Sequence, residues 1–394
     1  MPWRTTCPMN ERTQFIAACL LREESMSVLC RRFGISRKTG YKLLGRYAAE
    51  GPAGLGERSH APYQQPHALA ASVQQAILAL RAAHPHWGPR KLRAWLVGQG
   101  SGVWPAPSTI GALLQRSGLT VPRRRRRAAA PAGPRATAAG SNEVWAADFK
   151  GWFRTGDGRR CEPLTISDAY SRYLLRCQVL PAPTALLVRP VFEATFREYG
   201  LPRVIRTDNG SPFAALTVGG LSRLAVWWIR LGIRPERIAP GHPEQNGRHE
   251  RLHRTLKEET ATPPRGTLRA QQQAFDRFQR IYNHERPHEA LGQQPPAAWY
   301  GPSPRSYPER LPVLEYPDTY LVRRTHPNGD IKWRGRRVRI TQALAGEPVG
   351  LEEITDGRWR VWFGPIELGW LDARRPERLH SHVSTPRLLP ISLV

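Results

Sequence analysis

Three carboxylates in three different local contexts constrain this chain more than any other feature. Asp148 follows an apolar run within 144–149, which predicts a buried strand, and Asp208 closes a second predicted strand. Glu250 begins a stretch with the pattern of a helix. Carboxylates that converge from two strand ends and a helix can hold two divalent cations roughly 4 Å apart, as in-line phosphoryl transfer requires. The pattern therefore predicts a mixed α/β domain with an acidic centre.

The surrounding sequence divides the chain into parts by composition and periodicity. Strands and helices alternate through 142–302, which is typical of a mixed α/β domain. We expect multidomain α/β architecture with these parts: a helix-turn-helix unit at 1–60, a second helical DNA-binding unit at 66–120, an arginine-rich linker at 121–141, the catalytic core at 142–302, and a small β-barrel, expected to bind DNA, at 318–375.

The third predicted helix of the first unit has the features of a recognition helix. Ser36 is its expected N-cap. Side chains suited to bases and phosphates follow the cap, so we expect DNA contacts from Arg37, Lys38, Lys42 and Arg46. A three-helix bundle without a DNA-binding role is the alternative. The second unit either reads DNA as well or packs beside the first.

The charge of the chain favours a polyanionic partner. Its 59 Lys and Arg against 32 Asp and Glu give a formal net charge of +27, and no carboxylate occurs between Glu57 and Glu143. Basic surfaces bind nucleic acid by releasing the counterions condensed on its phosphates. A basic ribosomal protein and a solvated tether are the alternatives. In the linker, DNA contacts are expected from a run of five arginines, Arg123, Arg124, Arg125, Arg126 and Arg127.

Several classes of protein are excluded by what the sequence lacks. Five cysteines without a C-x-x-C pair argue against a disulfide framework and against a cysteine-rich zinc site. The start of the chain has no sustained apolar core typical of a signal peptide. No run approaches the roughly 20 apolar residues that cross a bilayer. We therefore expect a soluble, cytoplasmic protein with no membrane partner.

Five short motifs follow one another through the predicted core. They are Trp145-x-x-Asp148, Thr207-Asp208-Asn209-Gly210-Ser211-x-Phe213, Trp227-Trp228-x-x-x-Gly232-Ile233, Pro243-x-x-x-Gly247-x-x-Glu250 and Tyr282-Asn283-x-x-Arg286-Pro287-His288. In this order they closely resemble the motifs of bacterial insertion-sequence DDE transposases with a retroviral-integrase-type core. The match covers the whole predicted core, and the flanking units fit the usual layout of that family.

The resemblance implies a fold, an activity and a set of functional residues. It implies a ribonuclease-H-like core in which Asp148, Asp208 and Glu250 are the catalytic and metal-binding residues. The implied cofactor is Mg²⁺, for which Mn²⁺ would substitute, and no zinc is expected. The implied activity is cleavage at transposon ends and strand transfer into target double-stranded DNA by a multimer on paired ends. Lys257 is expected to contact the terminal DNA.

The identity of the third carboxylate depends on whether spacing or motif is followed. A spacing with 35 residues between the second acid and the glutamate, often given for the family, points to Glu244, whereas the motif points to Glu250, with 41 residues between it and Asp208. Glu244 lies in a predicted loop, where nothing fixes its direction. Glu250 lies in a predicted helix whose leucines can pack against the sheet, so we expect Glu250 to be the ligand. Asp168 is expected to hydrogen-bond its own turn instead of binding metal.

Two other functions are compatible with parts of the sequence. The run from His249 to His253 spells H-E-x-x-H, the zinc metalloprotease signature. That function would leave Asp148 and Asp208 without a role, so we expect both histidines to approach phosphate or to lie on the helix surface. The second alternative is a catalytically silent, domesticated DNA-binding regulator, which metal-dependent strand cleavage would distinguish from an enzyme.

Overall fold

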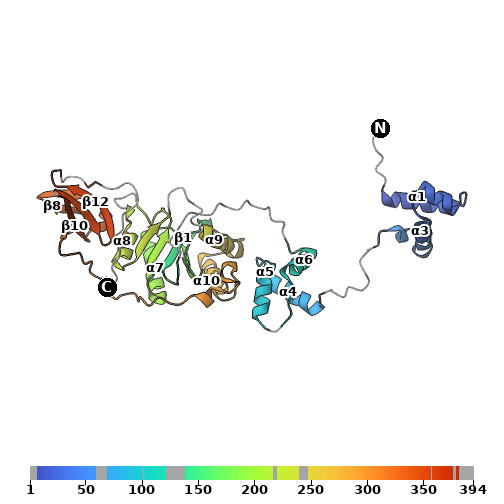
Figure 1. Ribbon diagram of the computed structural model, residues 1–394, viewed down its shortest axis with the longest axis horizontal. Helices are drawn as coiled ribbons and strands as arrows, with labels where there is room; N and C mark the ends of the chain where they lie inside the picture. The colour runs from blue at the N-terminus through green and yellow to red at the C-terminus, as the bar shows by residue number, and fades with distance from the viewer. Residues whose placement is uncertain are drawn as a thin grey trace. The chain divides into compact units, whose positions relative to one another are not determined.

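The computed structural model describes residues 7–58, 69–100, 102–120, 138–215, 220–238, 247–355, 357–375 and 379–380 (Figure 1). Contacts divide the chain into two compact units, 1–70 and 71–394. The arginine run at 123–127 and Glu244 lie outside the described residues. No helix in the described ranges is long and apolar enough to cross a membrane.

The first unit is a helix-turn-helix, as predicted. Its helices are α1 (Pro8–Leu21), α2 (Met26–Arg32), α3 (Arg37–Glu50) and the 3₁₀ turn η1 (Gly51–Leu55). The Ser36 side chain accepts a hydrogen bond from the backbone N–H of Thr39, which caps the start of α3. The helices enclose a small apolar core made of Phe15, Ile16, Leu29, Cys30, Leu43 and Leu55.

Three further helices lie at the beginning of the second unit. They are α4 (Ala71–Ala83), α5 (Pro89–Gly98) and α6 (Pro107–Arg116). Ile77, Leu92 and Ile110, one from each helix, are fully buried. A proline in the first turn of α5 and of α6 costs no hydrogen bond, because the N–H groups there have no partner within the helix.

A mixed sheet forms the centre of the second unit. Its strands are β1 (Val144–Phe149), β2 (Phe153–Arg154), β3 (Arg160–Asp168), β4 (Leu174–Leu180), β5 (Val204–Thr207) and β6 (Arg234–Arg237). The order is β2-β3-β1-β5-β6, and β4 pairs with β3. β1 runs antiparallel to β3 but parallel to β5. The sheet confirms the predicted mixed α/β core.

Helices cover both faces of this sheet. α7 (Ala185–Tyr199) and α8 (Arg223–Arg230) supply Phe192, Phe196 and Trp228 to a core that includes Trp145 of β1. On the other face, α9 (Gly247–Thr260) and α10 (Leu268–His284) pack Leu256 and Phe275, among others, against β3 and β4. Strand residues alternate between the two faces. Trp145 and Ala147 therefore face α7 and α8, whereas Asp148 faces α9.

The C-terminal part is a sheet with a separate hairpin. Its strands are β7 (Leu321–Arg324), β8 (Asp330–Trp333), β9 (Arg336–Arg339), β10 (Pro348–Thr355), β11 (Arg358–Phe363) and β12 (Ile366–Asp372). The four-stranded sheet has the order β12-β11-β10-β7, and β8 pairs with β9 alone. Among the described strands nothing joins β12 to β7, so the predicted closed barrel is not confirmed.

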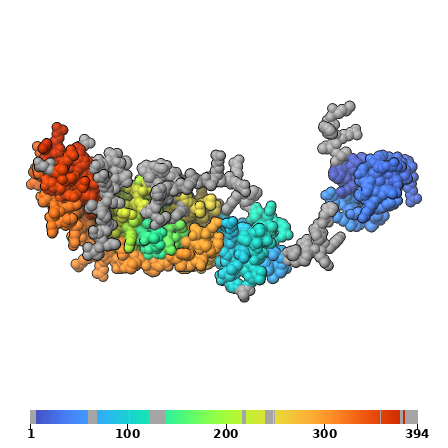
Figure 2. Space-filling view, in the orientation of Figure 1, coloured from blue at the N-terminus to red at the C-terminus, as the bar shows by residue number. Residues whose placement is uncertain are grey.

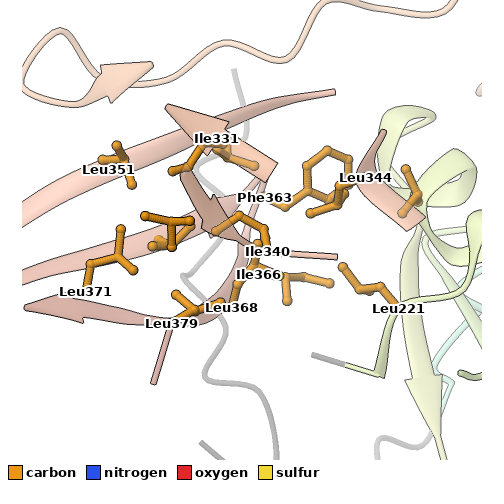
Figure 3. Close-up of a cluster of buried hydrophobic side chains, with 14 of the residues drawn as sticks. Leu221, Ile331, Ile340, Leu344, Leu351, Phe363, Ile366, Leu368, Leu371 and Leu379 are labelled. Carbon is orange, nitrogen blue, oxygen red and sulfur yellow. The ribbon is translucent and has the colours of Figure 1, made fainter. Parts of the chain in front are cut away.

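Helix α8 joins this C-terminal sheet to the core. One side of α8 packs Leu224, Trp227 and Trp228 into the core beneath the mixed sheet. Its other side, with the preceding Leu221, contributes Ala225, Val226 and Ile229 to the C-terminal hydrophobic cluster. Figure 3 shows Leu221 facing the buried side chains of the C-terminal strands. Arg230 adds an ion pair of 2.7 Å to Glu347.

The proline-rich segment 301–317 lies against the core and is not a free linker. Arg305 donates hydrogen bonds to the carbonyls of Pro202 and Leu231, at 2.8 and 3.0 Å. The backbone N–H of Ser303 donates to Tyr199 at 2.8 Å. In Figure 2 this orange stretch follows the surface of the core towards the C-terminal sheet. This segment, which lies between the predicted core and the predicted C-terminal domain, is therefore held to the core by hydrogen bonds.

Two buried histidines attach α9 to the mixed sheet. The Nε2 atoms of His253 and His249 lie 2.7 and 3.1 Å from Oγ1 of Thr165 on β3. Burial lowers the pKa of His249 to about 4. Burial, and then the neighbouring His249 and Lys150, lower that of His253 to about 2. The expectation that these histidines approach phosphate or lie on the helix surface is wrong, because both side chains are buried.

Replacing Ile229 by alanine should test the shared packing around α8. Ile229 is 3% exposed. The backbone of Gly364 packs closely against it, since a Cβ added at Gly364 would lie 3.1 Å from Cγ2 of Ile229. We therefore expect the neighbouring groups to fill little of the cavity that removal of this side chain would leave. We expect Ile229→Ala to lower the free energy of unfolding by about 2–5 kcal/mol in urea titrations. Leu186→Ala, at a residue that is 84% exposed on α7, is the matched control and should change little. Equal midpoints for the two variants would contradict the packing described.

The histidines predict a loss of stability in mild acid. Unfolding returns the imidazoles to a pKa near 6.5. Between that pH and the lower pKa of the folded state, the unfolded chain therefore binds protons that the folded chain does not bind. Stability is complete above pH 6.5 and falls as the pH drops towards 4, by about 2 kcal/mol per histidine between pH 7.5 and 5. His249→Asn should weaken this dependence in urea titrations at the two pH values. Exposed His326→Asn should retain it, and the same loss in all three proteins would contradict the assignment.

Candidate active site

Strand register brings Asp148 and Asp208 to the same level of the sheet. β1 and β5 are parallel, with Val144 opposite Val204 and Ala146 opposite Arg206. Two further residues along the same register place Asp148 opposite Asp208. Residues opposite each other in neighbouring strands point to the same face. Both carboxylates therefore start from adjacent strand ends on the face that α9 covers.

Asp148 lies in a mostly buried position beneath α9. Its side chain is 14% exposed, and its Oδ2 atom lies 3.9 Å from Nδ1 of His253. Thr165, directly opposite on β3, donates from Oγ1 to the backbone carbonyl of Asp148 at 3.2 Å. Because the pKa of His253 is lowered, this imidazole is neutral near pH 7, so its contact with Asp148 is not an ion pair between two charged groups.

Asp208 begins the turn after β5. The backbone N–H of Gly210 donates to its Oδ1 atom at 3.1 Å, and burial raises the pKa of the carboxyl above its usual value. A Cβ at Gly210 would lie 3.0 Å from Oδ2, so this glycine gives the carboxylate its room. Asn209 holds the turn by donating to the carbonyl of Ile238 at 2.8 Å.

Glu250 lies in the first turn of α9, and its side chain is exposed. Leu252 and Leu256 of the same helix are buried against the sheet, as predicted. The described residues contain no group of three His, Cys, Asp or Glu side chains close enough together to hold a metal ion. The structure thus aligns Asp148 with Asp208 and packs α9 over Asp148, but it does not gather Glu250 with them.

The H-E-x-x-H run does not have the arrangement of a metalloprotease centre. His249 and His253 point towards Thr165 in the interior, whereas Glu250 is exposed. The ring centroids of the two histidines lie 5.2 Å apart in an edge-on contact. Their nitrogens therefore act in packing α9 on β3.

The residues predicted to contact DNA differ in their surroundings. Arg37, Lys38 and Lys42 are exposed on α3. Arg46 instead donates from Nη2 to the carbonyl of Gly56 at 2.6 Å, which ties the end of the helical unit to α3. Lys257 is exposed on α9.

Asp168 has the predicted structural role. Its carboxylate accepts hydrogen bonds from the N–H groups of Asn142 and Ser171, at 2.9 and 2.7 Å, and from the Ser171 hydroxyl at 2.6 Å. It therefore links the start of β1 to the turn after β3.

A cationic and aromatic loop beside Asp148 escaped the sequence-based analysis. Lys150, Trp152 and Lys257 line a cavity of about 110 Å³ between this loop and α9. The signal in the sequence was a tryptophan placed among charged and glycine residues, Lys150-Gly151-Trp152-Phe153-Arg154, instead of within an apolar run.

Models of known domain families match most of the chain. An integrase core domain matches residues 138–243, and a second integrase core model matches 231–296. A helix-turn-helix domain matches 11–63 and a homeodomain-like domain matches 39–114. The C-terminal domain of the IS481 family transposases matches 320–378, the region of the sheet and hairpin.

Individual relatives agree with these matches. The chain is 29% identical to the insertion element IS476 uncharacterized 39.2 kDa protein of Xanthomonas euvesicatoria, over 70% of this chain and 78% of that protein. It is 27% identical to the insertion element IS407 uncharacterized 31.7 kDa protein of Burkholderia multivorans, over 56% and 78%. The HTLV-2 integrase catalytic core domain in complex with magnesium aligns with a TM-score of 0.33 and 14% identity, over 41% of this chain and 99% of that one.

Integrase core, helix-turn-helix units and transposase C-terminal domain follow one another along a single sequence. The chain therefore carries an integrase core domain, of the polynucleotidyl transferase class, and a C-terminal domain that matches that of the IS481 family transposases.

Proposed function

We propose that this transposase cuts DNA at the ends of its element and joins the freed 3′ ends to target DNA, with Asp148, Asp208 and Glu250 as its catalytic carboxylates. The observation that carries the proposal is the parallel register of β1 and β5, which continues to Asp148 opposite Asp208. Two carboxylates on one face of adjacent strand ends suit a cluster of hard cations. Helix α9 covers the same face and carries the third.

The donor set fits Mg²⁺, and Mn²⁺ would take its place. Carboxylate oxygens are the ligands that these ions prefer. Burial already disfavours the charge on Asp208, as its raised pKa indicates, and a nearby cation would reverse that effect. Bound divalent cations would lower the pKa of an attacking water and stabilise the leaving 3′ oxygen. Asp148 and Asp208 would hold the cations at the sheet, and Glu250 would complete the site from α9.

The reaction consists of two displacements at phosphorus. Water first breaks the phosphodiester bond at the transposon end, and the leaving group is a 3′ oxygen. The resulting 3′-hydroxyl then attacks a phosphodiester of the target strand, forming one bond as another breaks. The carboxylates keep the nucleophile and leaving group in line. No covalent intermediate with the protein is required.

Binding of the element ends would be divided among several parts of the chain. Arg37, Lys38 and Lys42 lie exposed along α3, as a recognition helix in a major groove requires. The arginine run at 123–127 would add contacts to phosphates, which confer affinity without sequence preference. Basic strands of the C-terminal sheet, expected to form a barrel-like DNA-binding module, would do the same. Paired ends imply that two or more copies act together.

Glu250 is the better candidate for the third carboxylate on physical grounds. Leu252 and Leu256 fix α9 against the sheet, and the two neutral histidines bind it to Thr165. Glu250, one residue from His249, therefore has a defined starting point close to Asp148. A change of rotamer, or a small shift in the first turn of α9, would bring its carboxylate towards the sheet.

Single substitutions of the carboxylates should separate catalysis from binding. We expect Asp148→Asn and Glu250→Gln to reduce strand transfer of a labelled end duplex into plasmid to the level without Mg²⁺. Affinity for the end duplex, measured by gel shift, should stay near that of the wild type, because α3 is unchanged. The end sequence would come from inverted repeats flanking the gene.

Two glutamates supply the controls for this experiment. Glu258→Gln changes an exposed ion pair on the same helix and should leave strand transfer intact. Glu244→Gln tests the alternative ligand. If this variant alone lost activity, the proposed transposase activity would stand, and Glu244 would take the place of Glu250 as the third carboxylate. A wild-type protein that binds the ends but never cuts them, with Mg²⁺ or Mn²⁺, would show a DNA-binding regulator.

A further inference from the structure

Trp152 is an exposed aromatic residue in a basic loop that follows Asp148. Its side chain is 54% exposed, whereas Trp145, Trp228 and Trp87 are fully buried. A half-exposed tryptophan leaves much of a large apolar ring in water and gains less packing energy for the fold than a buried one. Such a residue is often held in place for a binding partner.

Two guanidinium groups flank the ring, and that of Arg160 is also paired with the carboxylate of Glu162. The guanidinium carbons of Arg160 and Arg154 lie 5.0 and 5.8 Å from the centroid of the Trp152 ring. Asp157 is the one carboxylate in 150–160, against four cations in that stretch, namely Lys150, Arg154, Arg159 and Arg160. A protein partner with an apolar patch would not need this charge, but a nucleotide offers both an aromatic base and a phosphate.

The loop that carries Trp152 is anchored at both ends. Phe153 pairs with Cys161, and Arg154 with Arg160, in the β2–β3 ladder. The tip of this hairpin is tied to the loop after α9, because the N–H groups of Gly156 and Asp157 donate to Arg265 and Gly266 at 2.9 and 2.8 Å. The exposed ring is therefore presented by a rigid backbone, which reduces the entropy lost on binding.

Distance along the chain limits which nucleotide the ring can reach. Trp152 follows Asp148 by four positions in the sequence, so their Cα atoms lie at most about 15 Å apart. Successive phosphates of a strand are spaced a few ångströms apart, so the ring can reach the few nucleotides next to the bond that is cut. In a duplex the faces of the bases are covered by their neighbours, so an aromatic ring can stack only on an unpaired base.

We propose that Trp152, flanked by Arg154 and Arg160, stacks on an unpaired base beside the scissile phosphate and so positions the DNA strand over the carboxylates. This role rests on the proposed function. Trp152 is a positioning residue and not a catalytic one. It favours ends whose terminal nucleotides are unpaired over ends that are fully paired.

The test compares two end duplexes that differ only in pairing. One is blunt, and the other has a short unpaired overhang that contains 2-aminopurine, whose fluorescence falls when it stacks. The full-length wild type in EDTA should bind the overhang duplex on the order of tenfold more tightly than the blunt one, a factor that stacking on one base can supply. Its binding should also quench the probe.

Three variants separate stacking from other effects. Trp152→Ala should lose the preference and the quenching while keeping its affinity for the blunt duplex, whereas Trp152→Phe should keep most of both. Trp299→Ala, at a tryptophan that is 41% exposed elsewhere on the core, is the matched control and should behave as the wild type. Each variant should unfold at the same urea concentration as the wild type.

The other outcomes each decide against the inference. A preference for the overhang that survives in Trp152→Ala, or an equal loss of affinity for both duplexes, would overturn it while leaving the transposase activity in place. A change in oligomeric state by light scattering, with the preference unchanged, would show that Trp152 contacts a second copy instead. A wild type that binds neither duplex would refute the proposed function itself.

Discussion

The attachment of α9 to β3 is the interaction on which the proposed catalytic face depends. Two imidazoles meet one threonine hydroxyl in a buried, water-poor position, where hydrogen bonds are strong and hard to replace. Their neutrality is essential, because a charged imidazole at the same place would be costly to bury. The same contact fixes the position of Glu250 along the helix and sets a histidine 3.9 Å from Asp148. Thr165 thus links the packing of α9 on β3 to the surroundings of Asp148.

The mixed topology of the sheet explains how two aspartates that are 60 residues apart in the sequence come together. A parallel pair brings the carboxyl ends of β1 and β5 to one edge, whereas β3, antiparallel to β1, supplies the threonine from the opposite direction. An all-antiparallel arrangement would have placed Asp208 at the far end of its strand from Asp148. The crossover through α7 therefore makes the parallel pairing of β1 and β5 possible, and with it the proposed pairing of the two carboxylates.

Local patterns predicted much of this fold, and nonlocal contacts account for what they missed. The strands that carry Asp148 and Asp208, the helix of Glu250 and the cap at Ser36 follow from neighbouring residues alone. Closure of the C-terminal sheet depends on pairing between distant strands. The turn at Asn328-Gly329, expected to make a hairpin, instead connects β7 and β8, which lie in different sheets. His249 and His253 were expected on the helix surface because many of the residues of α9 are charged, and its apolar side is too short to be recognised from the sequence.

Two long cationic side chains act within the protein in ways that composition does not reveal. Arg305 holds the proline-rich segment 301–317 to the core by donating to the carbonyls of Pro202 and Leu231. Arg46, predicted from its place on α3 to contact DNA, also donates a hydrogen bond to the carbonyl of Gly56. In both cases a long cationic side chain acts within the protein, and its partner is a backbone oxygen that no pattern of side chains reveals.

The two-sided burial of α8 has a consequence for how this protein can evolve. Trp227 and Trp228 belong to one hydrophobic core, while Val226 and Ile229, in the same two turns, belong to the other. A C-terminal sheet from a relative would meet the wrong surface unless the outer side of α8 came with it. Recombination between such genes should therefore tolerate crossover points before α8 better than points within the proline-rich segment. The exchangeable module begins inside the catalytic core, well upstream of where the C-terminal strands start.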